Sequence, residues 1–316
     1  MYARTTDILI AGAGPAGATI ARLLALRGRR VVLVDPGTRH VDRLEVIAPA
    51  ACRVAEAVGI ARLLHDVSIA RPCPGIRRRW GSADIEIDDF LRRPGGKGYV
   101  IDRVPFDNAV RAMAMDAGVD GVSGRVVAAR REGGGVIVDV QSGARRFPVA
   151  AALVIDATGR PSAVARRLGA QRLLRERLVA ERRLVDARQD TLWLDVDGRQ
   201  DAWSYQVSGP AGRRESWTIH RSGRRVGRAC ADASSALLLR AAGDGWIAIG
   251  DAAASFDPIT SQGLSNALST ALVAAGAILS PSGFDESARD VYSDAVAATF
   301  QYSEAGRARV YAALAG

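Results

Sequence analysis

The chain has 316 residues, 48% hydrophobic and 24% charged, a balance typical of a globular protein with a sizeable buried core. Its net charge of +9 comes almost wholly from scattered arginines. The interleaved aromatic residues of a single-stranded nucleic-acid surface are missing, so we expect no nucleic-acid partner. Three cysteines and three histidines show no ligand spacing, which excludes a disulfide framework and predicts no metal site.

The cellular location is predicted from the start of the chain and from its apolar stretches. The first expected strand begins near Asp7, which leaves no room for a signal peptide. The longest apolar stretch, residues 267–279, is too short and too interrupted to span a membrane. Because no C-x-x-C pair occurs and cysteines are few, we expect a reduced, cytoplasmic protein, and we leave the oligomeric state open.

The N-terminal elements predict a βαβ unit. Residues 7–11 form an apolar run typical of a buried parallel strand, and residues 16–27 are rich in Ala and Leu at helical spacing. A second apolar strand over residues 31–34 ends at Asp35. Further elements are expected in this order: a helix over 49–64, one or two exposed strands within 70–98, a helix from 105, a hairpin over 126–140 and a buried strand over 151–155.

The composition changes after residue 168. Short runs with partial alternation predict an antiparallel sheet with one aromatic face, carrying Trp193, Trp203, Tyr205 and Trp217. A last apolar strand over residues 246–249 is followed by a second glycine-rich turn and an Ala-rich helix from about Gln262. The sequence therefore predicts an α/β fold that is interrupted by a smaller β-rich unit and then resumed.

The first glycine-rich turn lies between the first strand and the first helix and reads Gly12-Ala13-Gly14-Pro15-Ala16-Gly17. In a G-x-G-x-x-G turn the first glycine permits a tight bend, the second lets the backbone approach a pyrophosphate, and the third lets the helix pack on the strand. Asp35 is placed to accept a hydrogen bond from a ribose and disfavours a 2′-phosphate. This turn predicts a dinucleotide other than NADP.

Two more turns carry polar residues after buried strands. Asp251, directly after Gly250, can bind a sugar-like hydroxyl, or it is only a turn former or helix cap. Backbone N–H groups at the start of the following helix can stabilise negative charge on a reduced isoalloxazine ring. Asp156 and Gly159 follow the strand over 151–155, where such residues also simply end strands.

Together the three motifs resemble the para-hydroxybenzoate-hydroxylase-like FAD superfamily, which includes aromatic monooxygenases, flavin-dependent halogenases and geranylgeranyl reductases. The resemblance implies FAD as cofactor, bound to a Rossmann-like domain of the glutathione-reductase type with an inserted small antiparallel-sheet substrate domain. The implied FAD-binding residues are 1–70, 96–168 and 240–316, and the implied substrate domain spans 71–95 and 169–239.

The resemblance also implies roles for single residues. The ADP half of FAD is expected on Gly12, Gly14, Pro15, Ala16, Gly17 and Asp35. Arg103 resembles an arginine near the FAD phosphates, and Glu45 resembles an acidic residue after the second strand. The remaining expected contacts are Asp156 and Gly159 beside FAD and a transient nicotinamide, Gly250 and Asp251 at the ribityl chain, and Pro258, Gly263 and Leu264 beside the flavin ring.

A narrower resemblance comes from residues 79–82, 98–103 and 242–263, which are similar to halogenase-like flavoproteins that mature quinone-cofactor amine oxidases by oxygenating tryptophan in a partner protein. The chain lacks the W-x-W-x-I-P signature of halogenases, and its single lysine, Lys97, is expected to be exposed. Halogenation is therefore disfavoured. The inserted unit and the tail after Gln301 look short, so the pocket is compact or is completed by another subunit or a protein substrate.

We predict an FAD-dependent monooxygenase in which reduced FAD and O2 form a flavin hydroperoxide that hydroxylates an aromatic ring, either small or peptide-borne. NAD(P)H, or a separate flavin reductase, is expected to supply the electrons. No catalytic residue is identified: His220 is a candidate base by type alone, and the aromatic residues either line a substrate site or pack a core. The alternatives are reduction of isolated double bonds, halogenation, or a non-catalytic FAD-binding assembly partner.

Overall fold

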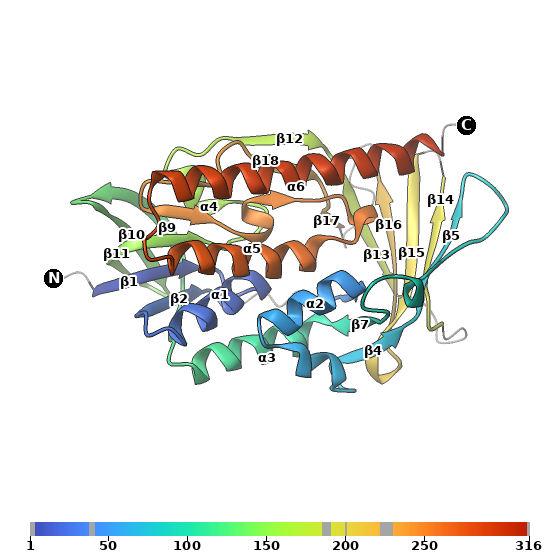
Figure 1. The fold of residues 1–316 in the computed structure, drawn as a ribbon, viewed down its shortest axis with the longest axis horizontal. Helices are drawn as coiled ribbons and strands as arrows, with labels where there is room; N and C mark the ends of the chain where they lie inside the picture. Colours follow the sequence, from blue (N-terminus) through green and yellow to red (C-terminus); the bar gives the residue numbers. More distant parts are fainter. Residues whose placement is uncertain (1–3, 38–41, 185–190, 200, 222–229, 315–316) are drawn as a thin grey trace.

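The computed structural model describes residues 4–37, 42–184, 191–199, 201–221 and 230–314 (Figure 1). Its first large sheet has eight strands, in which β1 lies between β2 and β11 and pairs with both in parallel. The strands are β1 (Arg4–Ala11), β2 (Val31–Asp35), β8 (Asp120–Ser123), β9 (Arg125–Glu132), β10 (Gly135–Ser142), β11 (Arg145–Asp156), β19 (Ala242–Gly243) and β20 (Trp246–Ala248).

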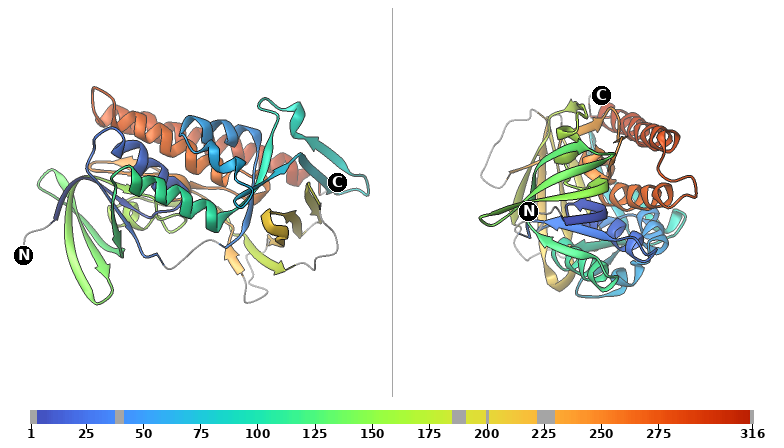
Figure 2. Two further views of the ribbon diagram at one scale, coloured as in Figure 1. Left: turned by 90° about the horizontal axis from the view of Figure 1, so that it is seen from below. Right: turned by 90° about the vertical axis from the view of Figure 1, so that its left-hand side faces the viewer.

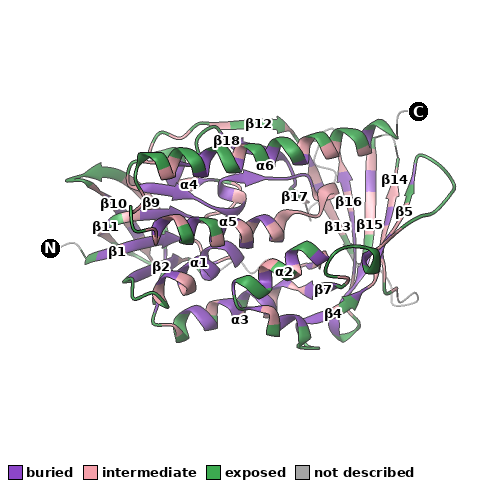
Figure 3. Ribbon diagram, in the orientation of Figure 1, coloured by how far each residue is buried: buried purple, intermediate pink, exposed green. Residues whose placement is uncertain are grey.

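Both faces of the central strands are covered, which is why they are continuous apolar runs. On one face, the core joins the sheet to three helices: α1 (Pro15–Ala25), α5 (Gly263–Ile278) and α6 (Glu286–Ala312) (Figure 2). On the other face, Leu9 and Val32 pack with Val138 of β10 and with Val164 of α4 (Ala163–Arg167). Figure 3 shows the central strands buried and the outer side of α6 exposed.

The second large sheet has seven strands and stands at the other end of the molecule (Figure 1). It is antiparallel except where β5 pairs with β14 in parallel. In sheet order its strands are β17 (Cys230–Asp232), β13 (Val179–Leu184), β16 (Arg214–His220), β15 (Ala202–Ser208), β14 (Leu194–Gly198), β5 (Gly75–Trp80) and β6 (Glu86–Asp89).

The described residues also form two small sheets, two further α-helices and five short 3-10 helices. One small sheet contains β3 (Leu44–Ile47), β7 (Gly98–Asp102) and β4 (Ala70–Cys73), and the other contains β12 (Arg172–Glu176), β18 (Ser235–Leu238) and β21 (Ala254–Ser255). The two further α-helices are α2 (Pro49–Ala57) and α3 (Arg103–Asp116). The predicted α/β fold class is confirmed, whereas the predicted domain boundaries stay a prediction.

Two local predictions need correction. The helix expected over 49–64 ends at Ala57, because Gly59 takes a φ of +74°, and a short 3-10 helix follows over Ala61–His65. The segment 70–98 holds three strands, and one of them, β5, is partly buried between β14 and β6. The tail after Gln301 belongs to α6 as far as Ala312, and its shortness relative to the family stays a prediction.

Candidate functional site

Two glycines of the first glycine-rich turn are required by the fold, and the third faces open space. Gly12 has a φ of +102°, and a Cβ there would overlap the carbonyl of Ala157. A Cβ on Gly17 would overlap the carbonyl oxygen of Gly12. In contrast, a Cβ on Gly14 would meet no described atom within 4 Å. The backbone at Gly14, at the N-terminus of α1, is therefore open to a ligand.

Asp35 stands beside this turn at the end of β2. Its carboxylate accepts hydrogen bonds from the backbone N–H of Ala13 at 2.7 Å and of Gly37 at 2.8 Å. Arg111 of α3 reaches the same turn and donates from Nε to the carbonyl oxygen of Ala13 at 2.9 Å. The sequence reasoning missed Arg111, since only the three-dimensional fold brings α3 to the turn.

Asp156 stabilises the turn that follows β11 from inside, through hydrogen bonds to its backbone. It is fully buried, and its carboxylate accepts from the backbone N–H groups of Thr158, Val164 and Ala165 at 2.7–3.0 Å. These bonds occupy both of its oxygens. Gly159 has a φ of +73° and open space where a Cβ would lie, so its backbone is the accessible part of this turn. Contact of either residue with FAD or nicotinamide stays a prediction.

Glu45 and Arg103 meet in an ion network in which Arg103 and Asp107 are buried and Glu45 and Arg43 are partly exposed. Arg103 donates from Nη1 to Glu45 at 2.6 Å and from Nε and Nη2 to Asp107 at 2.9 Å, while Arg43 donates to Glu45 at 3.0 Å. Burial alone would raise the pKa of Glu45, but the charges of the two arginines outweigh it and lower that pKa to about 2. The predicted contact of Arg103 with the FAD phosphates stays untested.

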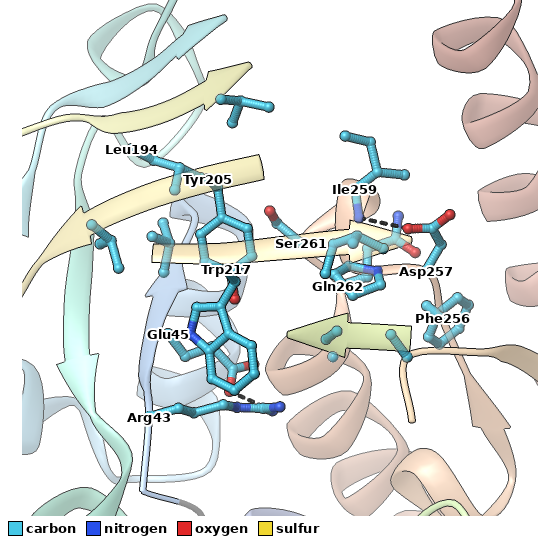
Figure 4. Close-up of a pocket in the computed structure, with 18 of the residues that line it drawn as sticks. Arg43, Glu45, Leu194, Tyr205, Trp217, Phe256, Asp257, Ile259, Ser261 and Gln262 are labelled. Carbon is cyan, nitrogen blue, oxygen red and sulfur yellow. Dashed lines mark hydrogen bonds and ion pairs between the residues drawn. The ribbon is translucent and has the colours of Figure 1, made fainter. Parts of the chain in front are cut away.

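A cavity lies between the second sheet and the turn that opens α5 (Figure 4). It encloses about 1100 Å³ of empty space, including the part open to solvent. Segments far apart in the sequence line it: Glu45 of β3 with Arg43 just before that strand, the sheet with Tyr205 and Trp217, and the turn over residues 256–263. In Figure 4 the labelled side chains of the sheet lie opposite those of the turn.

The sheet wall of the cavity is aromatic because of strand register. Tyr205 of β15 is directly opposite Trp217 of β16, and Trp203 lies two residues from Tyr205 on the same face. The ring centroids of Trp203 and Tyr205 are 5.8 Å apart. The prediction of one aromatic face is confirmed for these three residues, whereas Trp193 precedes β14 and lies outside the cavity.

The opposite wall contains the predicted residues of the second glycine turn. Asp251 lies 3.6 Å from Nε of Arg160, and both line the cavity with Pro258 and Gly263. Gly250 has a φ of +58°, and a Cβ there would touch the side chain of Ala16. The second glycine turn and the first therefore pack against each other. The side chain of Leu264 is buried in the core, so only its backbone belongs to the helix start.

Asp257 is a cavity residue that the sequence reasoning quoted but gave no role. It is buried, and burial raises the pKa of its carboxyl to about 6, against the opposing effect of hydrogen bonds from the Ile259 N–H and the Tyr311 hydroxyl. Tyr311 lies in the last turn of α6, the part of the chain that we expected to be a short tail. No local pattern in the sequence connects these two residues.

The remaining candidates lie away from the cavity. His220 is 3.3 Å from Glu181 and is not among the cavity residues, and Lys97 is exposed, as predicted. Across the described ranges, no group of three or more His, Cys, Asp or Glu side chains is arranged to hold a metal ion. Likewise, no helix in the described part of the chain is long and apolar enough to cross a membrane.

A family model and a curated relative match most of the chain. The family model described as "FAD binding domain" matches residues 5–226. A digeranylgeranylglycerophospholipid reductase of Methanoculleus marisnigri is 29% identical over 322 residues, which cover 85% of this chain and 75% of that protein.

Solved structures share the fold. A triple mutant of the flavin-dependent brominase Bmp2 has a TM-score of 0.81 at 19% identity, covering 98% of this chain and 89% of that one. The peptidyl tryptophan dihydroxylase QhpG has a TM-score of 0.76 at 22% identity, covering 97% and 74%.

The chain belongs to the FAD binding domain family, because the match covers more than half of its length. It is therefore an FAD-dependent oxidoreductase of the superfamily that its motifs resemble. The residues present fit the cofactor: the open backbone at Gly14 suits a pyrophosphate, and the cavity beside residues 256–263 offers room for a planar ring system.

Proposed function

We propose that this protein is an FAD-dependent monooxygenase that hydroxylates an aromatic substrate in the cavity between the sheet and the turn over residues 256–263. One observation carries the proposal: the wall facing that turn is formed by Trp203, Tyr205 and Trp217. Aromatic side chains at this spacing suit a flat ring, which gains from offset or edge-to-face contact.

The chain's own residues would bind and orient the two partners. Gly14 and the N-terminus of α1 would hold the pyrophosphate of FAD, and the backbone N–H groups at the start of α5 would face negative charge on the reduced ring. Ile76, Leu194 and Val196 give the cavity apolar sides that exclude water from the reacting atoms.

The reaction balances with one external reductant. When bound, FAD supplies two electrons and the site at which O2 is activated. One oxygen atom enters the aromatic ring and the other leaves as water, while NAD(P)H or a separate flavin reductase replaces the electrons. Burial raises the pKa of Tyr205, so its phenol stays neutral and acts as a donor or a packing surface, not as a base.

A substitution in the aromatic wall tests the proposal. Trp217→Leu and Tyr205→Leu should lower hydroxylation of an aromatic panel by roughly ten-fold or more, because each removes a ring that orients the substrate. FAD affinity should stay within a few-fold of native. Trp193→Leu is the matched control, as it removes the same type of side chain outside the cavity. Equal losses in all three variants would count against this site.

The panel should separate two sources of the aromatic ring. Free phenols and indoles form one arm, and short tryptophan-containing peptides form the other, a choice suggested by the peptidyl substrate of the structural relative QhpG. Turnover of either class supports hydroxylation. Binding of FAD without turnover of any electron donor would favour a non-catalytic partner.

Reduction of isolated double bonds is the second candidate. It is favoured by the relative from Methanoculleus marisnigri, a digeranylgeranylglycerophospholipid reductase matched over 85% of this chain. Anaerobic conversion of an isoprenoid alkene to its saturated product would support this candidate over ours. Halogenation has no comparable support, because the single lysine is exposed and lies outside the cavity.

A further inference from the structure

The last turns of α6 bridge the two walls of the cavity. The Tyr311 hydroxyl donates a hydrogen bond to Oδ2 of Asp257 at 2.8 Å and accepts one from Nε1 of Trp203 at 2.9 Å. One phenol therefore joins the aromatic sheet wall to the turn on the opposite side. Trp80 of β5 fixes the same helix end, because its Nε1 donates to the carbonyl oxygen of Val310 at 2.7 Å.

Asp257 stabilises the turn over residues 257–263 through its own hydrogen bonds. Its Oδ1 accepts from the N–H of Ile259 at 2.9 Å, and its carbonyl oxygen accepts from Oγ1 of Thr260 at 2.9 Å. Its own N–H donates to Oγ of Ser235 in β18 at 3.2 Å. A shift of Asp257 would therefore move the start of the turn that leads to α5.

The bridge is shielded from water. Asp257 is 1% exposed, Trp203 3% and Tyr311 7%. The guanidinium of Arg221 lies 4.3 Å from the centre of the Tyr311 ring. A hydrogen bond in such surroundings is stronger than one at the surface, and an unpaired group there is costly.

We propose that Tyr311 is a positioning residue of the FAD site, holding the turn over residues 257–263 at a set distance from the aromatic wall through its bond to Asp257. The inference rests on FAD binding beside this turn and not on the hydroxylation proposed above. It assigns a role to the C-terminal end of α6, which none of the three sequence motifs includes.

Charged groups around Asp257 make this bridge sensitive to pH. Burial raises the pKa of Asp257, while the Tyr311 hydrogen bond and the charge of Arg307, 3.8 Å away, lower it, and Glu176 raises it. Arg307 also forms ion pairs with Glu176 and Glu304. Above pH 6 the carboxylate is ionised and accepts fully from Tyr311; below pH 6 it becomes protonated.

The test uses the FAD-loaded protein and two tyrosine variants of one helix. Tyr311→Phe removes the bridging hydroxyl, and Tyr302→Phe, at a tyrosine 74% exposed on the same helix, is the matched control. The readouts are the dissociation constant of FAD and the visible circular dichroism of the bound flavin from pH 5 to 8. Native protein and the Tyr302 variant should show a spectral transition near pH 6.

In Tyr311→Phe we expect roughly ten-fold weaker FAD binding and a transition moved to higher pH, because the ionised carboxylate has lost a donor. Asp257→Asn should abolish the transition. The proposal is overturned if Tyr311→Phe lowers the thermal midpoint but keeps native FAD affinity, native spectrum and native pH dependence, since Tyr311 would then be structural only.

The outcomes separate this inference from the proposed function. If native protein binds FAD and hydroxylates nothing, the proposed reaction is contradicted. The flavin spectrum of Tyr311→Phe, compared with that of native protein, would still test the positioning role of Tyr311. A native protein that binds no FAD contradicts both.

Discussion

At the scale of single residues, the glycines of the first turn have two different tasks. Gly17→Ala should lower the thermal midpoint strongly without any FAD, because the new Cβ overlaps the Gly12 carbonyl oxygen. Gly14→Ala should leave that midpoint unchanged, since its Cβ enters open space, but should weaken FAD binding about ten-fold or more by crowding the pyrophosphate.

Thermal unfolding without FAD and a fluorescence titration with FAD measure the two effects separately. Loss of stability in the Gly14 variant, or native stability in the Gly17 variant, would contradict the division of tasks.

Glu45 should make the protein acid-sensitive in a defined range. Its folded-state pKa of about 2 is below the ordinary 4.5, so the stability it contributes is complete above pH 4.5 and is lost as pH falls towards 2. Glu45→Gln should remove this part of the acid sensitivity. It should also cost about 1–3 kcal/mol at neutral pH, because Arg43 and Arg103 lose the negative charge of a shared, partly exposed partner.

The measurement is the free energy of unfolding in urea between pH 3 and pH 7, with Glu56→Gln on the exposed side of α2 as control. An acid dependence of Glu45→Gln as steep as that of the native protein and of the control would contradict the assignment.

At the scale of elements, Asp156 decides whether β11 connects correctly to α4. Its two oxygens accept from the backbone at Thr158, Val164 and Ala165, and an asparagine has only one acceptor oxygen for them. We expect Asp156→Asn to destabilise the protein by about 2–4 kcal/mol, since buried N–H groups lose their partners. Urea unfolding measures this loss, and the exposed Asp244→Asn is the control; comparable stability of the two variants would contradict it.

Elements with local signals were predicted well, and elements defined by distant partners were not. β1, α1 and β2 follow from an apolar run, a glycine turn and a helical pattern within 35 residues. β5 was hidden in a Pro- and Gly-rich segment, because its register is set by parallel pairing with β14, more than 100 residues further on. In that pairing Trp80 lies opposite Gly198, whereas Gly75 lies opposite Asp89 of β6.

At the scale of the whole molecule, the site is assembled from segments that no single stretch of sequence reveals. The sequence predicted the turns that carry Gly14, Asp35 and Asp251, because phosphate and sugar binding use short motifs. It did not predict that Arg111 reaches the first turn or that Tyr311 joins Asp257 to Trp203. Such contacts depend on how helices pack across the sheets, which single-sequence patterns do not encode.

The function that we propose is oxygen transfer to an aromatic ring in the cavity, and its direct measurement is the source of the product's oxygen. FAD-loaded protein, NAD(P)H or a reduced-flavin supply, and the aromatic panel are incubated under ¹⁸O2, and products are analysed by mass spectrometry. We predict a hydroxylated product that carries one ¹⁸O atom and whose yield falls by roughly ten-fold or more in Trp217→Leu. Conversion of an isoprenoid alkene to its saturated product without O2, or an oxygenated product without ¹⁸O, would contradict the account.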